Sequence, residues 1–258
     1  MLIHQHYHRN GPDYRMGEQM TFLEVKQTFG FSHVRVGSWV TREESLKAAN
    51  LVFDSLADLA FMLKLPPLTL GLRQSLSLAF GHGGQKGVQA HYAPAARELA
   101  LAKNAGAGAL AHEFWHAFDH YIAAKAFDGK IGRFQCASDL WLGDARLVAH
   151  PLNERLSEIF RVTLLSEDNQ QPSDYVRCAI VLDKQHGSRY FAKPTEIMAR
   201  AFEACIESYQ GITNPYLVSG TLQSSLAKEG AYPDISHRAR IWQALIAYFE
   251  PLGLALSK

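Results

Sequence analysis

Cysteine is scarce in this sequence: the chain has only three, Cys136, Cys178 and Cys205. They are odd in number and widely spaced, and no two of them form a CxxC pair. This pattern excludes a disulfide framework and a zinc site built from cysteine, and it favours a reducing compartment. We therefore expect a cytoplasmic protein whose cysteines are core residues.

An excess of charge of one sign is also missing, because 26 Lys and Arg side chains face 25 Asp and Glu side chains. Nucleic-acid-binding proteins usually carry a basic excess, so the charge balance does not favour such a partner. No stretch approaches the ~18 consecutive apolar residues of a membrane span, and the first residues lack the apolar core of a signal peptide. We expect neither a nucleic-acid partner nor a membrane.

What the sequence does contain is the composition of a globular protein, with 258 residues, 47% of them apolar and 20% charged. That length can form a single large domain with a buried core. We predict one α+β domain over residues 1–258, with an N-terminal extension (1–30), a sheet and a long helix (31–126) and a helical part (127–258). Expected strands lie near 33–40, 68–81, 88–92 and 98–103, and expected helices lie near 42–65, 108–126, 151–166, 173–185, 195–208 and from 236 onward.

The most informative motif is residues 112–116, which read His-Glu-Phe-Trp-His. On a helix, positions i and i+4 differ by about 40° in direction and about 6 Å in height. His112 and His116 can therefore bind one zinc ion from one side, with Glu113 beside the open position as a general base. The opposite face of the predicted helix is apolar, which favours a metal site over a surface helix with two idle histidines.

Asp119 and His120 extend the polar face of this helix. His120 lies about 12 Å along the helix axis from His112, too far to bind the same ion. Asp119 could orient His116 or anchor a neighbouring helix. Ordinary polarity of an exposed helix face is the alternative interpretation for Asp119 and His120.

A third ligand must come from elsewhere, because a catalytic zinc site needs three protein ligands and an open position. In the helix predicted after Pro194, four charged side chains share one face, the last three within about 40° of the first at helical spacing: Glu196, Arg200, Glu203 and Glu207. The other faces are apolar. We expect the first carboxylate to reach the metal and Arg200 to hold Glu196 and Glu203. An exposed stripe of i,i+4 pairs is the alternative.

Two segments carry a resemblance to a known family. Residues 106–119 read Gly-Ala-Gly-Ala-Leu-Ala-His-Glu-Phe-Trp-His-Ala-Phe-Asp, and the run from Glu196 reads Glu-Ile-Met-Ala-Arg-Ala-Phe-Glu. Together they resemble the gluzincin metallopeptidases. The chain is similar to the zincin-like domain associated with large polyvalent proteins of phages and conjugative elements, and to the stand-alone bacterial CLCA_X family, from about residue 28 to beyond 208. The resemblance implies a zincin-like fold, with a small, mostly antiparallel sheet packed on the histidine helix and a helical C-terminal part.

The resemblance also implies roles for individual residues. It implies one zinc ion per chain, bound by His112, His116 and Glu196, with Glu113 as the base. It favours Glu196 over Glu203 as the ligand, because the ligand stands ahead of the Ala-x-Ala-Phe run.

Two aromatic residues bear on the expected catalysis. Tyr190 lies six residues before Glu196, and its hydroxyl could stabilise the oxyanion of the reaction; a packed aromatic is the alternative. Trp115 departs from the family pattern, because relatives usually have Gly there. A bulky indole at this position puts access of the substrate in doubt more than binding of the metal.

These observations predict a zinc-dependent peptidase that hydrolyses a peptide or protein substrate through a zinc-activated water, with Glu113 as general base. The strand at 98–103 could bind an extended substrate by adding a strand. The rival hypothesis is a non-catalytic zincin-fold binding module linked to mobile genetic elements. His4, His6 and His8 alternate and could share a strand face, but ordinary polar N-terminal residues are the simpler interpretation.

Overall fold

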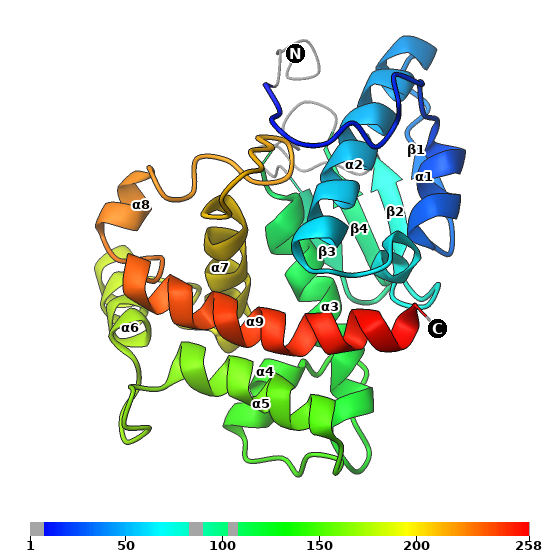
Figure 1. The fold of residues 1–258 in the computed structure, drawn as a ribbon. Coiled ribbons are helices and arrows are strands. Elements are labelled where there is room, and N and C mark those ends of the chain that lie inside the picture. Colours follow the sequence, from blue (N-terminus) through cyan, green and yellow to red (C-terminus); the bar gives the residue numbers. More distant parts are fainter. Residues whose placement is uncertain (1–7, 83–89, 103–107, 258) are drawn as a thin grey trace.

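The computed structural model describes residues 8–82, 90–102 and 108–257, and these form an α+β fold in which a small sheet lies at one side of a larger group of helices (Figure 1). The described elements follow in chain order: α1 (Phe22–Phe29), β1 (Val34–Val36), α2 (Arg42–Met62), the 3₁₀ helix η2 (Pro67–Gly71), β2 (Ser77–Phe80), β3 (Ala90–Ala93), β4 (Glu98–Leu101), α3 (Leu110–Ala126), α4 (Ala137–Leu142), α5 (Pro151–Leu164), α6 (Asp174–His186), α7 (Pro194–Glu207), α8 (Ser225–Lys228) and α9 (Ile235–Leu256).

The sheet has the strand order β1-β2-β4-β3 and is mostly parallel. The pairs β1–β2 and β2–β4 are parallel, and only β3–β4 is antiparallel. The expectation of a mostly antiparallel sheet is therefore wrong. The physical reason is that α2 connects β1 to β2, and a helical crossover brings the chain back in the same direction. Only β3 and β4 are joined by a tight turn.

Strand β4 cannot bind an extended substrate in the way the sequence suggested. It lies between β2 and β3, so both of its edges are already paired. Strand β3 is the outer strand on this side of the sheet, and it packs against α3. An added strand next to α3 would therefore have to pair with β3.

The predicted helices of the chain are present, and their bounds agree with the sequence pattern to within a few residues. A capping box begins α2: the Glu44 amide donates to the Thr41 hydroxyl, and the Thr41 amide donates to the Glu44 carboxylate. Three helices were not expected: α1, α4 and α8. Residues 68–81 form η2 and a short strand instead of one long strand. None of the described helices is long and apolar enough to cross a membrane.

Helix α1 lies in the segment where little regular structure was expected. Its side chains Phe22, Val25 and Phe29 are buried, with exposed fractions of 6% or less. Thr21 and Glu24 form a capping box at its start. The segment was hard to recognise because the helix has only eight residues and therefore repeats its apolar pattern barely twice.

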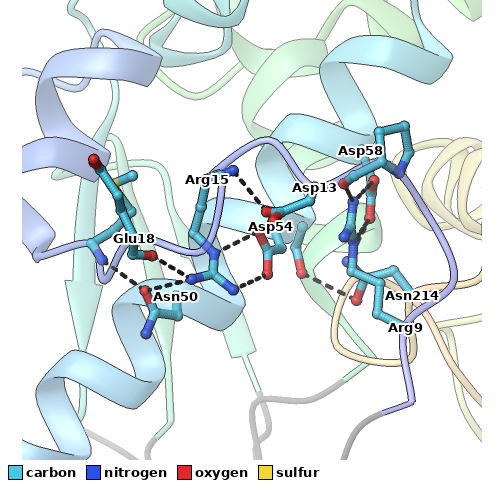
Figure 2. Close-up of polar contacts among 11 residues, drawn as sticks. Arg9, Asp13, Arg15, Glu18, Asn50, Asp54, Asp58 and Asn214 are labelled. Atoms are coloured by element: carbon cyan, nitrogen blue, oxygen red, sulfur yellow. Dashed lines mark hydrogen bonds and ion pairs between the residues drawn. The ribbon is translucent and has the colours of Figure 1, made fainter.

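The residues before α1 are tied to α2 by two arginine–aspartate pairs (Figure 2). Arg9 donates to both oxygens of Asp58 at 2.6 Å, and Arg15 donates to Asp54 at 2.9 and 3.1 Å. Asp58 is fully buried and also accepts a 2.8 Å hydrogen bond from the side chain of Asn214. The buried carboxylate thus joins the N-terminal segment, α2 and the loop after α7. Its ion pair with Arg9 offsets the free energy lost when the carboxylate is removed from water.

Candidate metal centre

The start of α3 is fixed by the loop that follows α7. The Gly108 amide donates to the Tyr216 carbonyl at 2.9 Å, and the Ala111 amide donates to the Leu217 carbonyl at 3.1 Å. The second bond satisfies one of the first amides of α3, which have no partner within the helix. Gly108 has a φ of +89°, and an added Cβ would lie 2.3 Å from the Ser219 hydroxyl. Only glycine therefore fits this approach.

Helices α3 and α7 pack against each other and bring three potential ligands together. The His112 and His116 Nε2 atoms are 3.1 Å apart. Glu196 Oε2 lies 3.4 Å from His112 Nε2, and Glu196 Oε1 lies 3.5 Å from His116 Nε2. Ligand atoms about 2.1 Å from a tetrahedral zinc ion are about 3.4 Å from each other. The three side chains are therefore spaced to hold one ion.

The chemistry of the donor set also fits zinc. Two imidazole nitrogens and one carboxylate form a common set of protein ligands for catalytic zinc. The Glu196 Oε2 atom is buried without a hydrogen bond, and the Arg200 Nη2 atom lies 4.0 Å from it; a cation bound between the three side chains would compensate for the burial of this oxygen. The side chains of His112, His116 and Glu196 keep exposed fractions of 12–16%, so the group reaches solvent.

Glu196 is held in place by the way α7 begins. Pro194 occupies the first turn, where its missing amide proton costs nothing. The buried Arg200 side chain donates from Nε to the Glu196 carbonyl at 3.4 Å and from Nη2 to the Phe191 carbonyl at 3.1 Å. It packs over the rings of Tyr190 and Phe191, whose centroids are 5.1 and 4.9 Å away. Arg200 thus fixes the first turn of α7.

Glu203 lies behind His112 and does not join the three ligand atoms. Its Oε1 atom is 3.3 Å from His112 Nδ1, the nitrogen that faces away from Glu196 and His116. A carboxylate on the outer nitrogen of a ligating histidine fixes the orientation of the ring and raises its basicity. Burial and the nearby charge of Glu203 raise the pKa of Tyr232, so its hydroxyl lies within electrostatic range of Glu203. No pattern in the sequence pointed to Tyr232, because it lies in a loop far from both helices.

Glu113 is oriented by strand β3. Its Oε2 atom accepts a 2.7 Å hydrogen bond from the Tyr92 amide. Burial raises the pKa of Glu113 to about 7, against the opposing effect of the His112 charge. The charge of Glu196 adds to the upward shift, so Glu113 lies within electrostatic range of His112 and Glu196.

The charges of the four side chains are strongly coupled. Burial alone would lower the pKa of His112, but its contacts with Glu196 and Glu203 raise it to about 10. Burial and the neighbouring His112 lower the pKa of His116 to about 4. Burial opposes ionisation of Glu196, but its contacts with His112 and His116 hold its pKa at about 2. The pocket thus favours an ionised Glu196 facing a cation.

Asp119 and His120 take structural positions. Asp119 is fully buried and accepts hydrogen bonds from the Ser138 amide at 2.8 Å and the Ser138 hydroxyl at 2.6 Å. It therefore anchors α4, which is one of the two roles expected for it. His120 Nε2 donates to the Arg133 carbonyl at 2.7 Å, so its Nδ1 accepts from the Tyr92 hydroxyl at 2.6 Å.

The two aromatics singled out in the sequence lie on different sides of the site. Tyr190 is 45% exposed, and burial of its hydroxyl and the nearby charge of Glu196 raise the pKa of Tyr190 above its ordinary value. Trp115 is fully buried, with ring centroids 5.4 Å from Phe118 and 4.9 Å from Phe202. The indole fills the core between α3 and α7, so it does not narrow the metal-binding face. Among the N-terminal histidines, His4 and His6 lie outside the described residues and His8 is exposed.

We predict that Glu203→Gln lowers the affinity for zinc by about 10- to 100-fold, because the amide supports the His112 ring less well than a carboxylate does. Isothermal titration calorimetry with zinc measures the change. Glu154→Gln, an exposed change on α5, is the matched control and should leave the affinity unaltered. Equal affinities in wild type and Glu203→Gln would show that Glu203 does not act through His112.

Comparison with known proteins gives one partial match. Residues 182–256 match the family model "Large polyvalent protein-associated domain 1". The matched segment carries Glu196 and Glu203 but not the histidine helix. No curated protein and no solved structure matches the chain. The segment that supplies the third potential ligand is therefore similar to a domain of large polyvalent proteins.

Proposed function

We propose that this chain is a zinc-dependent peptidase of the gluzincin type, with His112, His116 and Glu196 as ligands of one zinc ion. The observation that carries the proposal is the convergence of the three side chains: the two histidine Nε2 atoms are 3.1 Å apart, and each lies 3.4–3.5 Å from one of the two Glu196 carboxylate oxygens, with Glu113 within electrostatic range of His112 and Glu196. When bound, zinc supplies a Lewis acid that makes water a stronger nucleophile and polarises the substrate carbonyl.

Glu113 is the group that moves protons in this proposal. The hydrogen bond from the Tyr92 amide holds Glu113 Oε2, which leaves Oε1 to accept a proton from the attacking water. Glu113 then returns the proton to the leaving amine nitrogen. A pKa raised by burial to about 7 suits both steps near neutral pH.

Tyr190 and strand β3 are the groups we propose to contact the substrate. Tyr190 is partly exposed and lies within electrostatic range of Glu196, so its hydroxyl could donate to the developing oxyanion. Strand β3 is the outer strand nearest α3, so an extended peptide could add to it. A peptide or protein in the cytoplasm is the substrate class we propose, and the free thiols of Cys136, Cys178 and Cys205 accord with that compartment.

The binding-module hypothesis is less well supported. A site that holds zinc only for stability is usually closed by four protein ligands. Here the group has three ligands, some exposure to solvent, and an acid residue next to it. The burial of Trp115 also removes the reason for doubting access of a substrate.

The proposal is tested by incubating the zinc-loaded protein with unfolded casein and following cleavage by mass spectrometry. We expect cleavage that a chelator abolishes and that added zinc, but not magnesium, restores, because imidazole ligands favour zinc. A rise in melting temperature with zinc but no cleavage of casein or of a peptide library would support the binding module instead.

A further inference from the structure

A cavity of about 530 Å³ lies on the face of α3 that is turned away from the metal centre. It is enclosed by η2 and the turn after it, by α3, and by the C-terminal part of α9. At about 100° per residue, Phe114 and Phe118 point about 120–160° away from His112 and His116 around the helix axis. The cavity is therefore separate from the metal site, although both are built on α3.

The inner wall of the cavity is apolar and buried. Its rings include Phe114, Phe118 and Phe249, all buried with exposed fractions of 3% or less. Gly253 of α9 packs closely against the turn that follows α2. An added Cβ on Gly253 would lie 2.0 Å from the Lys64 carbonyl oxygen in that turn. The volume falls within the roughly 300–1,000 Å³ that small-molecule sites span. The wall suits an apolar chain.

Among the described residues that line the cavity, the charged ones are both cations. Arg73 and Lys125 line it and are exposed, and no acidic side chain is among its lining residues. Among the described residues, neither cation has an acidic partner within 4.0 Å. Lys125 Nζ lies over the ring of Tyr121 at 4.6 Å. Two unpaired cations at the mouth of an apolar cavity favour an anionic head group.

The backbone that places Arg73 is unusual. Leu72, Arg73 and Gln74 have φ values of 51°, 56° and 59° in succession, a left-handed conformation that is unfavourable for residues with a Cβ. The Ser75 hydroxyl stabilises the turn by donating to the Leu72 carbonyl at 2.6 Å. Backbone held in this way often serves ligand binding, and here it sets Arg73 at the mouth of the cavity.

We propose that this cavity binds a monomeric amphipathic anion, an aliphatic chain that ends in a carboxylate. The chain packs against the rings of the inner wall, and the carboxylate accepts hydrogen bonds from the Arg73 guanidinium and the Lys125 ammonium. The charge of the rim selects an anion over a cation or a neutral head group of the same chain length. This site is independent of the proposed peptidase activity.

Isothermal titration calorimetry of the full chain with dodecanoate, below its micelle concentration, tests the proposal. We expect one molecule bound per chain, and binding of dodecyltrimethylammonium weaker by about ten-fold or more, because charged hydrogen bonds are lost. The Arg73→Glu/Lys125→Glu double variant should lose affinity for dodecanoate by a similar factor. Both residues are exposed, so the fold should persist, which circular dichroism checks.

The matched control is the Lys184→Glu/Lys228→Glu double variant, which makes the same charge change at exposed positions on α6 and α8, far from the C-terminal end of α9 (Figure 1). It should bind dodecanoate like the wild type. The proposal is overturned by equal binding of the anionic and cationic chains, by an equal loss in the two double variants, or by no binding of dodecanoate at all.

Discussion

Replacing His116 by Ala should reduce the zinc content of the purified protein from near one equivalent to a small fraction of that. The variant leaves only His112 and Glu196, and a zinc ion held by two protein side chains binds weakly. A zinc site with four protein ligands has a binding free energy of about 10–16 kcal/mol. If each ligand contributes an equal share, the loss of one ligand lowers the affinity by about 100- to 1,000-fold. Elemental analysis after extensive dialysis measures the zinc content directly.

His120→Ala is the matched control for this experiment. His120 lies one turn further along α3, and both of its ring nitrogens are engaged, with the Tyr92 hydroxyl and the Arg133 carbonyl. It therefore cannot contribute to the same ion, and its removal should leave the zinc content near one equivalent. Full retention of zinc by His116→Ala, or equal loss in both variants, would contradict the assignment of His116 as a ligand.

Replacing Glu113 by Gln should abolish cleavage of peptides while zinc stays bound. The amide is nearly isosteric and its oxygen can still accept the hydrogen bond from the Tyr92 amide, but it cannot take a proton from water at neutral pH. General acid–base groups contribute about 10²–10⁴-fold to the rate, so kcat should fall by about that factor. Cleavage of a quenched peptide identified in the casein experiment gives kcat, and elemental analysis gives the zinc content.

Glu154→Gln on α5 makes the same chemical change at an exposed position and should leave kcat unaltered. Unchanged kcat in Glu113→Gln would exclude this residue as the base. Loss of zinc together with activity would mean that Glu113 is needed for the site itself, and the proposed mechanism would then be wrong.

The sequence predicted the helices well because their apolar patterns are long and their caps are local. Thr41 and Glu44 cap α2 within four residues of chain, so the signal is contained in the sequence. Strand pairing was predicted wrongly because it depends on partners that are far apart in the chain. For example, Val34 pairs with Leu78, and the whole of α2 lies between them in the chain. A helix between two strands is typical of a parallel pair, and this pattern should have indicated a parallel sheet.

In the candidate site, too, the local features were predicted and the contacts between distant parts of the chain were not. The i,i+4 spacing of His112 and His116 is a local signal, and the acidic stripe of α7 narrowed the third ligand to a few carboxylates. Glu113 accepts its hydrogen bond from the backbone amide of Tyr92. Because almost every residue has such an amide, the sequence does not show which one is the donor. Asp119 binds Ser138 in a helix of only six residues that no periodic pattern revealed. Such contacts depend on how the elements pack.

The most direct test of the metal site is a crystal structure of the zinc-loaded protein with anomalous data collected on either side of the zinc absorption edge. The account predicts one anomalous peak between α3 and α7, about 2.0–2.2 Å from His112 Nε2, His116 Nε2 and a carboxylate oxygen of Glu196. No peak at this position in zinc-loaded crystals, or a zinc ion there that Glu203 binds in place of Glu196, would contradict it.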